Sequence, residues 1–291
     1  MMVTTSLVAL ALAAVACGAK SSTSATTTTV AKVATDPAAA ALVPAGIKAR
    51  GVLTVALDAS YPPDELIAPD GRTITGMDAD LATAIGQVLG LRVEPVNATF
   101  DTIIPGLQSG KFDMGASSFT DTKEREKVVD FVTYFTSSEG FYISASNTAT
   151  FDGLGSLCGH SVAVESGTTE ADDAMAQVKA CQDAGRPADN VLVFQDQNAG
   201  NLAVSTGRAE VGFSDSQVAK YVVDQSKGQF KLTGKPFNPS VYGIAVPKNG
   251  VAQAVLAAVK DLIGDGTYLK ILTKWGIQDG AIASPVINGA S

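Results

Sequence analysis

The chain has 291 residues, of which 46% are hydrophobic and 17% are charged, and it carries no long acidic or basic block. This composition is typical of a well-packed globular protein and excludes a disordered chain, and the length is enough for two lobes of ordinary domain size. The formal net charge of −8 argues against a nucleic-acid partner, because phosphate binding needs clustered lysine and arginine, although acidity also serves solubility alone.

The N-terminus has the pattern of a secretory signal. Residues 7–16 form an apolar run that is too short to span a bilayer as a helix and that ends in small residues before Cys17. The segment Ala14-Val15-Ala16-Cys17 resembles the bacterial lipobox. We therefore expect a lipoprotein signal peptide over residues 1–17 and lipidation of Cys17, with a plain cleaved signal and an incidental cysteine as the alternative.

The next segment predicts a flexible tether. Residues 18–47 are rich in serine, threonine and alanine and lack the apolar periodicity of a folded element. After a lipidated cysteine, such a tether would hold a folded domain above a membrane surface.

The series of folded elements begins with a βαβ unit. We predict strands at 52–57 and 91–96 and an amphipathic helix at 77–90 between them, which Gly90 ends. A strand, a helix and a strand over about 45 residues imply parallel strands. A short helix at 101–109 and a strand at 112–117 follow.

The second half of the chain repeats this order of elements. Two α/β series of similar size predict two lobes, although the sequence alone does not show that the last part returns to the first lobe. We predict strands at 161–164, 191–194, 209–214 and 241–246, and helices at 170–184, 199–206, 216–224, 251–263 and 268–275.

Within the second series, the two cysteines left after Cys17 predict a disulfide. Cys158 and Cys181 are most simply paired outside the cytoplasm, with two free buried thiols as the alternative. The lone His160 and the cysteine spacing do not suit a metal site, and we expect no metal and no cofactor.

Polar side chains follow four of the predicted strands, where open parallel sheets bind ligands. Arg125 offers a charged fork for a carboxylate, and Asp215 offers an acceptor for an ammonium group. The N–H groups at the start of the helix after Thr168 and Thr169 also favour an anion. A flat apolar face comes from Tyr61, and further donors come from Ser117, Ser118 and Thr120.

These parts together predict a site for a zwitterion, but each has a simpler reading. Arg125 lies in a charged run and would be an exposed helix residue in that case. Asp215 would cap the helix that follows it, and the serines and threonines would stabilise turns.

Taken together, the motifs of the chain resemble family 3 of the bacterial extracellular solute-binding proteins, the polar amino acid binders of ABC importers. The resemblance covers residues 51–276. It rests on Asp58-Ala-Ser-Tyr61-Pro-Pro, Gly76-Met-Asp78-Ala-Asp80-Leu, Ile104-Pro-Gly-Leu-Gln-Ser-Gly-Lys-Phe-Asp113, Thr120-Asp-Thr122-Lys-Glu-Arg125, Val129-Asp130-Phe131, Gly167-Thr168-Thr169, Gly207-Arg-Ala-Glu210, Asp215 and Lys274-Trp275-Gly276.

The resemblance implies a two-lobed α/β fold of the type II periplasmic-binding-protein kind. Each lobe is a mostly parallel sheet flanked by helices, and two hinge crossovers join the lobes. By this analogy, lobe 1 comprises residues 48–140 and 243–291, and lobe 2 comprises residues 144–238.

The same resemblance assigns a role to each site residue. Arg125 matches the clamp for the ligand α-carboxylate, with help from Thr120 and the amides of Thr168 and Thr169. Asp215 matches the α-ammonium acceptor. The walls around the ligand side chain match Tyr61 and Phe100, and the remaining polar contacts match Ser117, Ser118 and Asp58.

The chain departs from the family pattern at Asp64, where an aromatic residue is usual. Asp58, Asp64, Glu165 and Glu170 add negative charge near the inferred pocket, and no cation besides Arg125 occupies a matched position. Because a buried unpaired charge is costly, the ligand side chain is expected to be cationic or neutral and polar, as in Arg, Lys, His or Gln. The alternative is that these acids point into solvent.

We expect a monomeric binding protein, not an enzyme, that is anchored to the outer face of the cell membrane by lipid alone. Its partners would be a small amino acid and the transmembrane subunits of an ABC importer. The alternatives are an enzyme on the same fold, such as a cyclohexadienyl dehydratase or a peptidoglycan lyase, a receptor sensor domain, and a structural lipoprotein. An enzyme would need a general acid or base beside the reacting bond.

Overall fold

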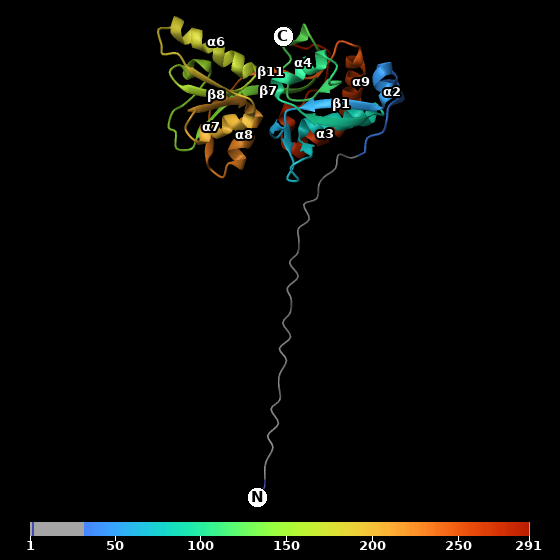
Figure 1. Cartoon of the computed structure of the whole chain (residues 1–291), viewed down its shortest axis with the longest axis horizontal. Coiled ribbons are helices and arrows are strands. Elements are labelled where there is room, and N and C mark those ends of the chain that lie inside the picture. The colour runs from blue at the N-terminus through green and yellow to red at the C-terminus, as the bar shows by residue number, and fades with distance from the viewer. Residues whose placement is uncertain (1, 3–31, 291) are drawn as a thin grey trace.

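The computed structural model describes residues 2 and 32–290, and these residues form two lobes that lie side by side (Figure 1). A single eight-stranded sheet runs through both lobes in the order β5-β1-β6-β11-β7-β10-β8-β9. Strands pair in parallel at each end of this order, and the central strands β11 and β7 are antiparallel to their neighbours. The two-lobed α/β fold that the sequence predicts is therefore confirmed.

The first lobe joins the two ends of the described chain. The strands of this lobe are β1 (Val52–Leu57), β2 (Ser60–Tyr61), β3 (Glu65–Ile67), β4 (Ile74–Thr75), β5 (Arg92–Asn97) and β6 (Met114–Gly115). Its helices are α1 (Pro37–Ala41), α2 (Ala45–Arg50), α3 (Met77–Val88), α4 (Phe100–Gln108), α5 (Lys123–Glu126), α9 (Val251–Gly264) and α10 (Thr267–Trp275), with a 3-10 turn at Gln278–Gly280.

The second lobe is built from the middle of the chain. Its strands are β8 (Ser161–Glu165), β9 (Asn190–Phe194) and β10 (Val211–Asp215), and its helices are α6 (Thr169–Asp183), α7 (Gln197–Ser205) and α8 (Ser216–Gln225). A 3-10 turn, Leu154–Leu157, precedes β8. The predicted disulfide lies in this lobe, where Cys158 and Cys181 are bonded with their Cα atoms 5.6 Å apart.

Two long strands connect the lobes. These are β7 (Asp130–Ser144) and β11 (Phe230–Val246), which pair with each other in both lobes. Their register shifts between Thr233 and Phe237 and again before Ser240, where Pro236 and Pro239 offer no N–H to the ladder. Only the last six residues of β11 were expected as a strand, and β7 was not expected at all. Because β7 is buried almost along its whole length, its side chains do not alternate between apolar and polar, and Pro236 and Pro239 interrupt the pattern of β11.

The hydrophobic core is divided in the same way as the sheet. One pair of buried clusters covers the two faces of the sheet in the first lobe and includes Leu53, Tyr134, Ile103 and Phe131. A second pair belongs to the other lobe and is centred on Phe141, Phe213, Val204 and Ala219. Each lobe therefore has its own core, and the strand crossings between them are the natural place for bending.

The tether expected over residues 18–47 is wrong in its last part. Helices α1 and α2 begin within it, and the side chains of Ala39, Val43 and Ile47 are at most 5% exposed in the core of the first lobe. Asp36 accepts a hydrogen bond from the amide of Ala38 and Pro37 follows it, which is a helix start that alanines then propagate. The part of the tether up to residue 31 and Cys17 itself lie outside the described residues.

Candidate functional site

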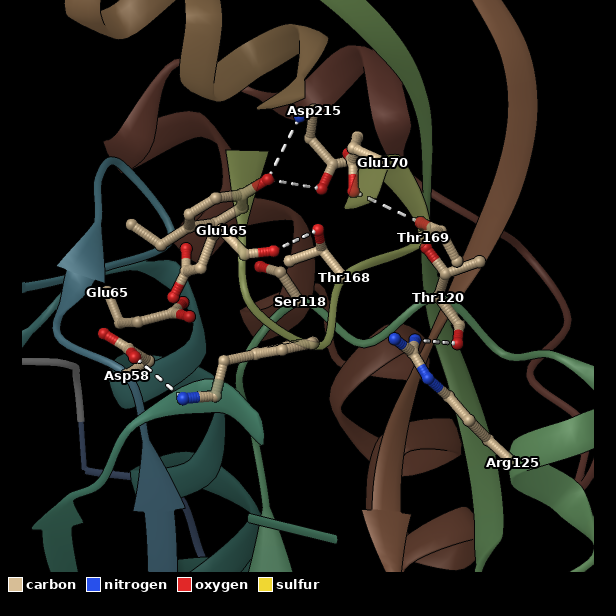
Figure 2. A pocket seen from close by; sticks show the side chains of 12 residues that line it. Asp58, Glu65, Ser118, Thr120, Arg125, Glu165, Thr168, Thr169, Glu170 and Asp215 are labelled. Atoms are coloured by element: carbon tan, nitrogen blue, oxygen red, sulfur yellow. Dashed lines mark hydrogen bonds between the residues drawn. The ribbon is translucent and has the colours of Figure 1, made fainter. Parts of the chain in front are cut away.

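A small pocket, called the cavity below, lies between the two lobes. Figure 2 shows side chains from both lobes converging on it. Its lining consists of Asp58, Tyr61, Glu65, Phe100, Ser118, Thr120, Arg125, Glu165, Thr168, Thr169, Glu170 and Asp215. Nine of the ten ligand-contact residues expected from the sequence are in this lining, which excludes Ser117.

The lining residues sit at strand ends, as the sequence analysis expected. Asp58 directly follows β1, while Glu165 and Asp215 are the last residues of β8 and β10. Strand β1 is parallel to β5 and β6, and β8 is parallel to β9 and β10. The carboxyl ends of the parallel strands of each lobe therefore meet at the edge that faces the other lobe.

Arg125 reaches the cavity from the short helix α5. Its Nη1 donates to the carbonyl oxygen of Thr120 at 2.7 Å, and its Nη2 donates to that of Gly167, in the other lobe, at 2.9 Å. The guanidinium also lies 5.5 Å from the ring centroid of Phe100, within range of a cation–π contact. Arg125 is therefore a positioned cation between the lobes and not the solvent-exposed helix residue of the simpler reading.

Asp215 precedes α8, but its side chain makes no capping hydrogen bond to that helix. Its Oδ2 accepts from the hydroxyl of Tyr61 at 2.8 Å, and its Oδ1 accepts from that of Ser137 at 3.0 Å. Burial raises the pKa of Asp215 to about 6, and hydrogen bonds and the charge of Arg125 act in the opposite direction. The capping alternative for Asp215 is wrong, and its carboxyl group faces the cavity.

Thr168 and Thr169 mark the start of α6. The hydroxyl of Thr168 accepts from the amide of Ala171 at 3.1 Å and donates to the carbonyl of Glu165 at 2.8 Å, so it fixes the turn. The N-terminus of a fifteen-residue helix therefore points at the cavity, where its first amides favour an anion.

Two aromatic rings give the cavity its flat walls. Tyr61 is 7% exposed and is fixed by its hydrogen bonds with Asp215. Phe100 stacks on Phe119 with the ring centroids 4.4 Å apart. Both rings line the cavity, and their contact with a ligand side chain stays a prediction.

Ser117 lies behind the cavity lining. It is 1% exposed, its hydroxyl donates to Glu65 at 2.7 Å, and the same oxygen accepts from the amide of Asp58 at 2.9 Å. Ser117 thus holds the carboxyl group of Glu65 and the backbone of Asp58, and the direct ligand contact expected for it is not supported by its position.

Glu65 is the lining residue that the sequence analysis missed. It is placed by the short hairpin of β2 and β3, in which it pairs with Tyr61. The register of two such short strands leaves no sequence signal. Asp64, by contrast, was expected near the pocket and is fully buried behind it, where it accepts from Ser118 at 2.9 Å.

The cavity has a strong excess of acidic groups. Within the part of the chain that the structure describes, five lining residues carry carboxyl groups, namely Asp58, Glu65, Glu165, Glu170 and Asp215, and Arg125 is the one cation of the lining. Burial raises the pKa of each of these carboxyl groups, and repulsion from neighbouring carboxylates adds to the shift for Glu65, Glu165 and Glu170. Of the four acids that the sequence suggested near the pocket, Asp58, Glu165 and Glu170 line it and Asp64 is fully buried, so the alternative that they point into solvent is wrong.

The lobes are closed on each other around the cavity. The amide of Gln197 donates to the hydroxyl of Ser60 at 3.1 Å, and Gln217 donates to Asp64 at 2.9 Å. The hydroxyl of Ser166 donates to Asp101 at 3.0 Å. These contacts join residues of opposite lobes and shield the cavity from bulk water.

Two further properties of the described residues bear on chemistry. In that part of the chain, no cluster of histidine, cysteine and acidic side chains has an arrangement that would hold a metal ion. Nor does any helix within residues 32–290 have the length and apolar character needed to cross a membrane.

Comparison with known proteins relates the chain to one family. Residues 53–278 match the model of the bacterial extracellular solute-binding proteins, family 3. The arginine-binding protein ArgT of Corynebacterium glutamicum is 31% identical over 254 residues, which cover 87% of this chain and 83% of that protein.

Two other matches agree with this relationship. The ABC transporter glutamine-binding protein GlnH of Bacillus subtilis is 30% identical over 73% of this chain and 77% of its own length. An ancestral arginine-binding protein whose structure contains arginine is 34% identical, with a TM-score of 0.71 over 78% of this chain and 99% of that one.

Proposed function

Since the chain belongs to family 3 of the bacterial extracellular solute-binding proteins, we propose that it delivers an amino acid with a cationic side chain, foremost L-arginine, to an ABC importer. The observation that carries this choice is the charge of the cavity. Five carboxyl groups face one guanidinium in a space shielded from water. A buried charge without a partner is costly, so the ligand that fits has positive charge to spare beyond its α-ammonium group.

The lining offers one place for each group of such a ligand. Arg125 and the amides at the start of α6 suit the α-carboxylate. Asp215 suits the α-ammonium, because it is a buried acceptor already held by two hydroxyl donors.

The side chain would then extend between Tyr61 and Phe100 toward the remaining acids. Asp58, Glu65 and Glu165 lie together at that end of the cavity in Figure 2. A guanidinium has five donors in a planar fork, and three carboxyl groups can accept them.

The ligand is bound by closure of the lobes, and no covalent bond is formed or broken. Arg125 and Asp215 lie on opposite sides of the cleft, so a ligand that contacts both stabilises the closed arrangement over the open one. Bending would occur where β7 and β11 cross between the lobes. The importer subunits would recognise the closed form.

A neutral polar ligand such as glutamine is the second candidate for the same site. The similarity to a glutamine-binding protein supports it, but glutamine would leave the acids at the side-chain end without a cation. An enzyme on this fold is disfavoured because the relatives reported above are binding proteins, and because His160 pairs with Glu210 at 2.8 Å instead of lining the cavity.

Anchoring to the membrane by an acylated Cys17 completes the proposal. It rests on the lipobox-like sequence Ala14-Val15-Ala16-Cys17. Metabolic labelling with a palmitate analogue should mark the wild-type protein and leave Cys17→Ala unmarked, with the variant released into the medium or periplasm. Equal labelling of both proteins would refute the anchor.

The ligand is tested by calorimetry and thermal shift against L-arginine, L-lysine, L-histidine, L-glutamine and L-glutamate at pH 7. A ligand that binds only the folded state raises the melting temperature, and we expect the largest rise for arginine. Tight glutamate or aspartate binding without binding of arginine or glutamine would overturn the proposal. Turnover of prephenate or arogenate would favour the enzyme instead.

A further inference from the structure

Asp58 and Glu165 form a pair of carboxyl groups that opposite lobes bring together. Asp58 follows β1 in the first lobe, and Glu165 ends β8 in the second. Both are buried, with 5% and 3% of their surface exposed, and both line the cavity. Their side chains line the same pocket and are close enough to influence each other's ionisation, and two carboxyl groups can share a hydrogen bond only when one of them holds a proton.

The two partners are not equivalent. Asp58 accepts hydrogen bonds from the amides of Ser60 at 3.1 Å and Phe100 at 2.9 Å, which hold it as a carboxylate. Glu165 has no such support, and its Oε1 is without a hydrogen-bond partner within the described part of the chain. Glu165 is therefore the member that takes the proton.

Apart from Arg125, the described residues that line the cavity bring no cation to the pair. Burial raises the pKa of Glu165 well above its ordinary value, and Asp58, Asp196 and Glu170 raise it further. Glu65 lines the same cavity from β3, and the neutral Tyr142 faces Glu165 from β7. Arg125 belongs to the lining as well, but its guanidinium is bound to Thr120 and Gly167.

We propose that Asp58 and Glu165 form a switchable bridge between the lobes, closed either by the cationic side chain of the ligand or by a proton. The inference rests on the proposed binding of a cationic amino acid. With arginine bound, the guanidinium lies between two carboxylates and no proton is needed. With a neutral side chain, closure brings two like charges together, so Glu165 takes one proton from water.

The bridge makes Glu165 a determinant of specificity at neutral pH. When a neutral ligand binds, Glu165 must take up a proton at the same time, and few protons are available at pH 7. Its affinity therefore rises relative to that of arginine as the pH falls.

L-citrulline is the probe that separates charge from shape, because it replaces the guanidinium of arginine by a neutral urea group of the same size. Calorimetry in buffers of different ionisation enthalpy counts the protons taken up with each ligand. At pH 7, the wild type should take up about one proton more when it binds citrulline than when it binds arginine. Both ligands bind the same unliganded protein, so the protonation of that state drops out of the comparison. The same comparison is made for Glu165→Gln and for Glu210→Gln, a matched control whose side chain is 45% exposed on the second lobe.

In Glu165→Gln, the amide can donate to Asp58 and imitate the protonated acid. The proton difference between the two ligands should vanish, and the preference for arginine over citrulline should fall by about tenfold or more, while Glu210→Gln behaves like the wild type. An unchanged proton difference in Glu165→Gln would overturn the bridge. So would absence of citrulline binding to the wild type at pH 5.5, because a proton would then not replace the cation. Failure of the wild type to bind arginine would instead refute the proposed function.

Discussion

Replacing Asp215 by asparagine tests the proposed ammonium site with little change in shape. The amide oxygen of asparagine can accept from the hydroxyl of Tyr61, which lies 2.8 Å from Oδ2 of Asp215. Its NH2 group can donate to the hydroxyl of Ser137, which lies 3.0 Å from Oδ1 and can itself donate to Gln217 at 2.6 Å. Asp215 makes no capping hydrogen bond to α8, so the variant loses no cap. What it loses is the negative charge opposite the α-ammonium group.

The expected loss follows from the burial of the site. Asp215 is 5% exposed, and removing one charge of a buried pair costs about 3 kcal/mol, which corresponds to an increase in Kd of about 150-fold. The pH dependence gives a second readout. Because burial raises the pKa of Asp215 to about 6 and the ligand needs the ionised form, wild-type affinity should fall as the pH falls through 6.

The assay is isothermal titration with L-arginine at pH 7 and pH 5. We expect wild-type affinity to drop by about tenfold over this interval and the drop to be smaller in Asp215→Asn. Asp224→Asn is the control, since Asp224 lies at the other end of α8 in a surface ion pair with Lys220. Binding by Asp215→Asn within about threefold of the wild type, with an unchanged pH profile, would refute the assignment.

Three further predictions concern other parts of the molecule. Arg125→Ala should raise the Kd for arginine by more than about 100-fold with the fold intact, and Arg125→Lys should retain part of the affinity; micromolar binding by Arg125→Ala would argue against the clamp. Asp64 is fully buried beside Asp78. Burial is the main reason that the pKa of Asp64 lies well above its usual range, and the charge of Asp78 raises it further. The folded state therefore favours protonated Asp64. The stability that this protonated side chain contributes is fully present below the pKa of the unfolded chain, near 4, and is lost as the pH rises above it. Asp64→Asn should accordingly raise the melting temperature at pH 8 but hardly at pH 4, and equal shifts at both pH values would contradict this. The double variant Cys158→Ser/Cys181→Ser opens a loop of 23 residues and should lower the free energy of unfolding by about 3 kcal/mol in urea titrations; no change in the midpoint would contradict it.

The sequence determined the two α/β series and the approximate place of the site. Apolar periodicity located α3, α6, α8 and α9, because a helix that covers a sheet shows its buried face every three or four residues. The polar residues at strand ends could be identified from the sequence because parallel strands place their carboxyl ends at one edge.

The tertiary structure decided which of these residues meet across the cleft. Glu65 enters the lining through the pairing of the three-residue strand β3 with the two-residue strand β2. Ser117 lies behind the lining, although its neighbour Ser118 is part of it. The pairing of Asp58 with Glu165 depends on how two separately folded lobes are placed by β7 and β11. A contact between residues more than a hundred positions apart leaves no local pattern, because it depends on the packing of whole lobes rather than on the propensity of any segment.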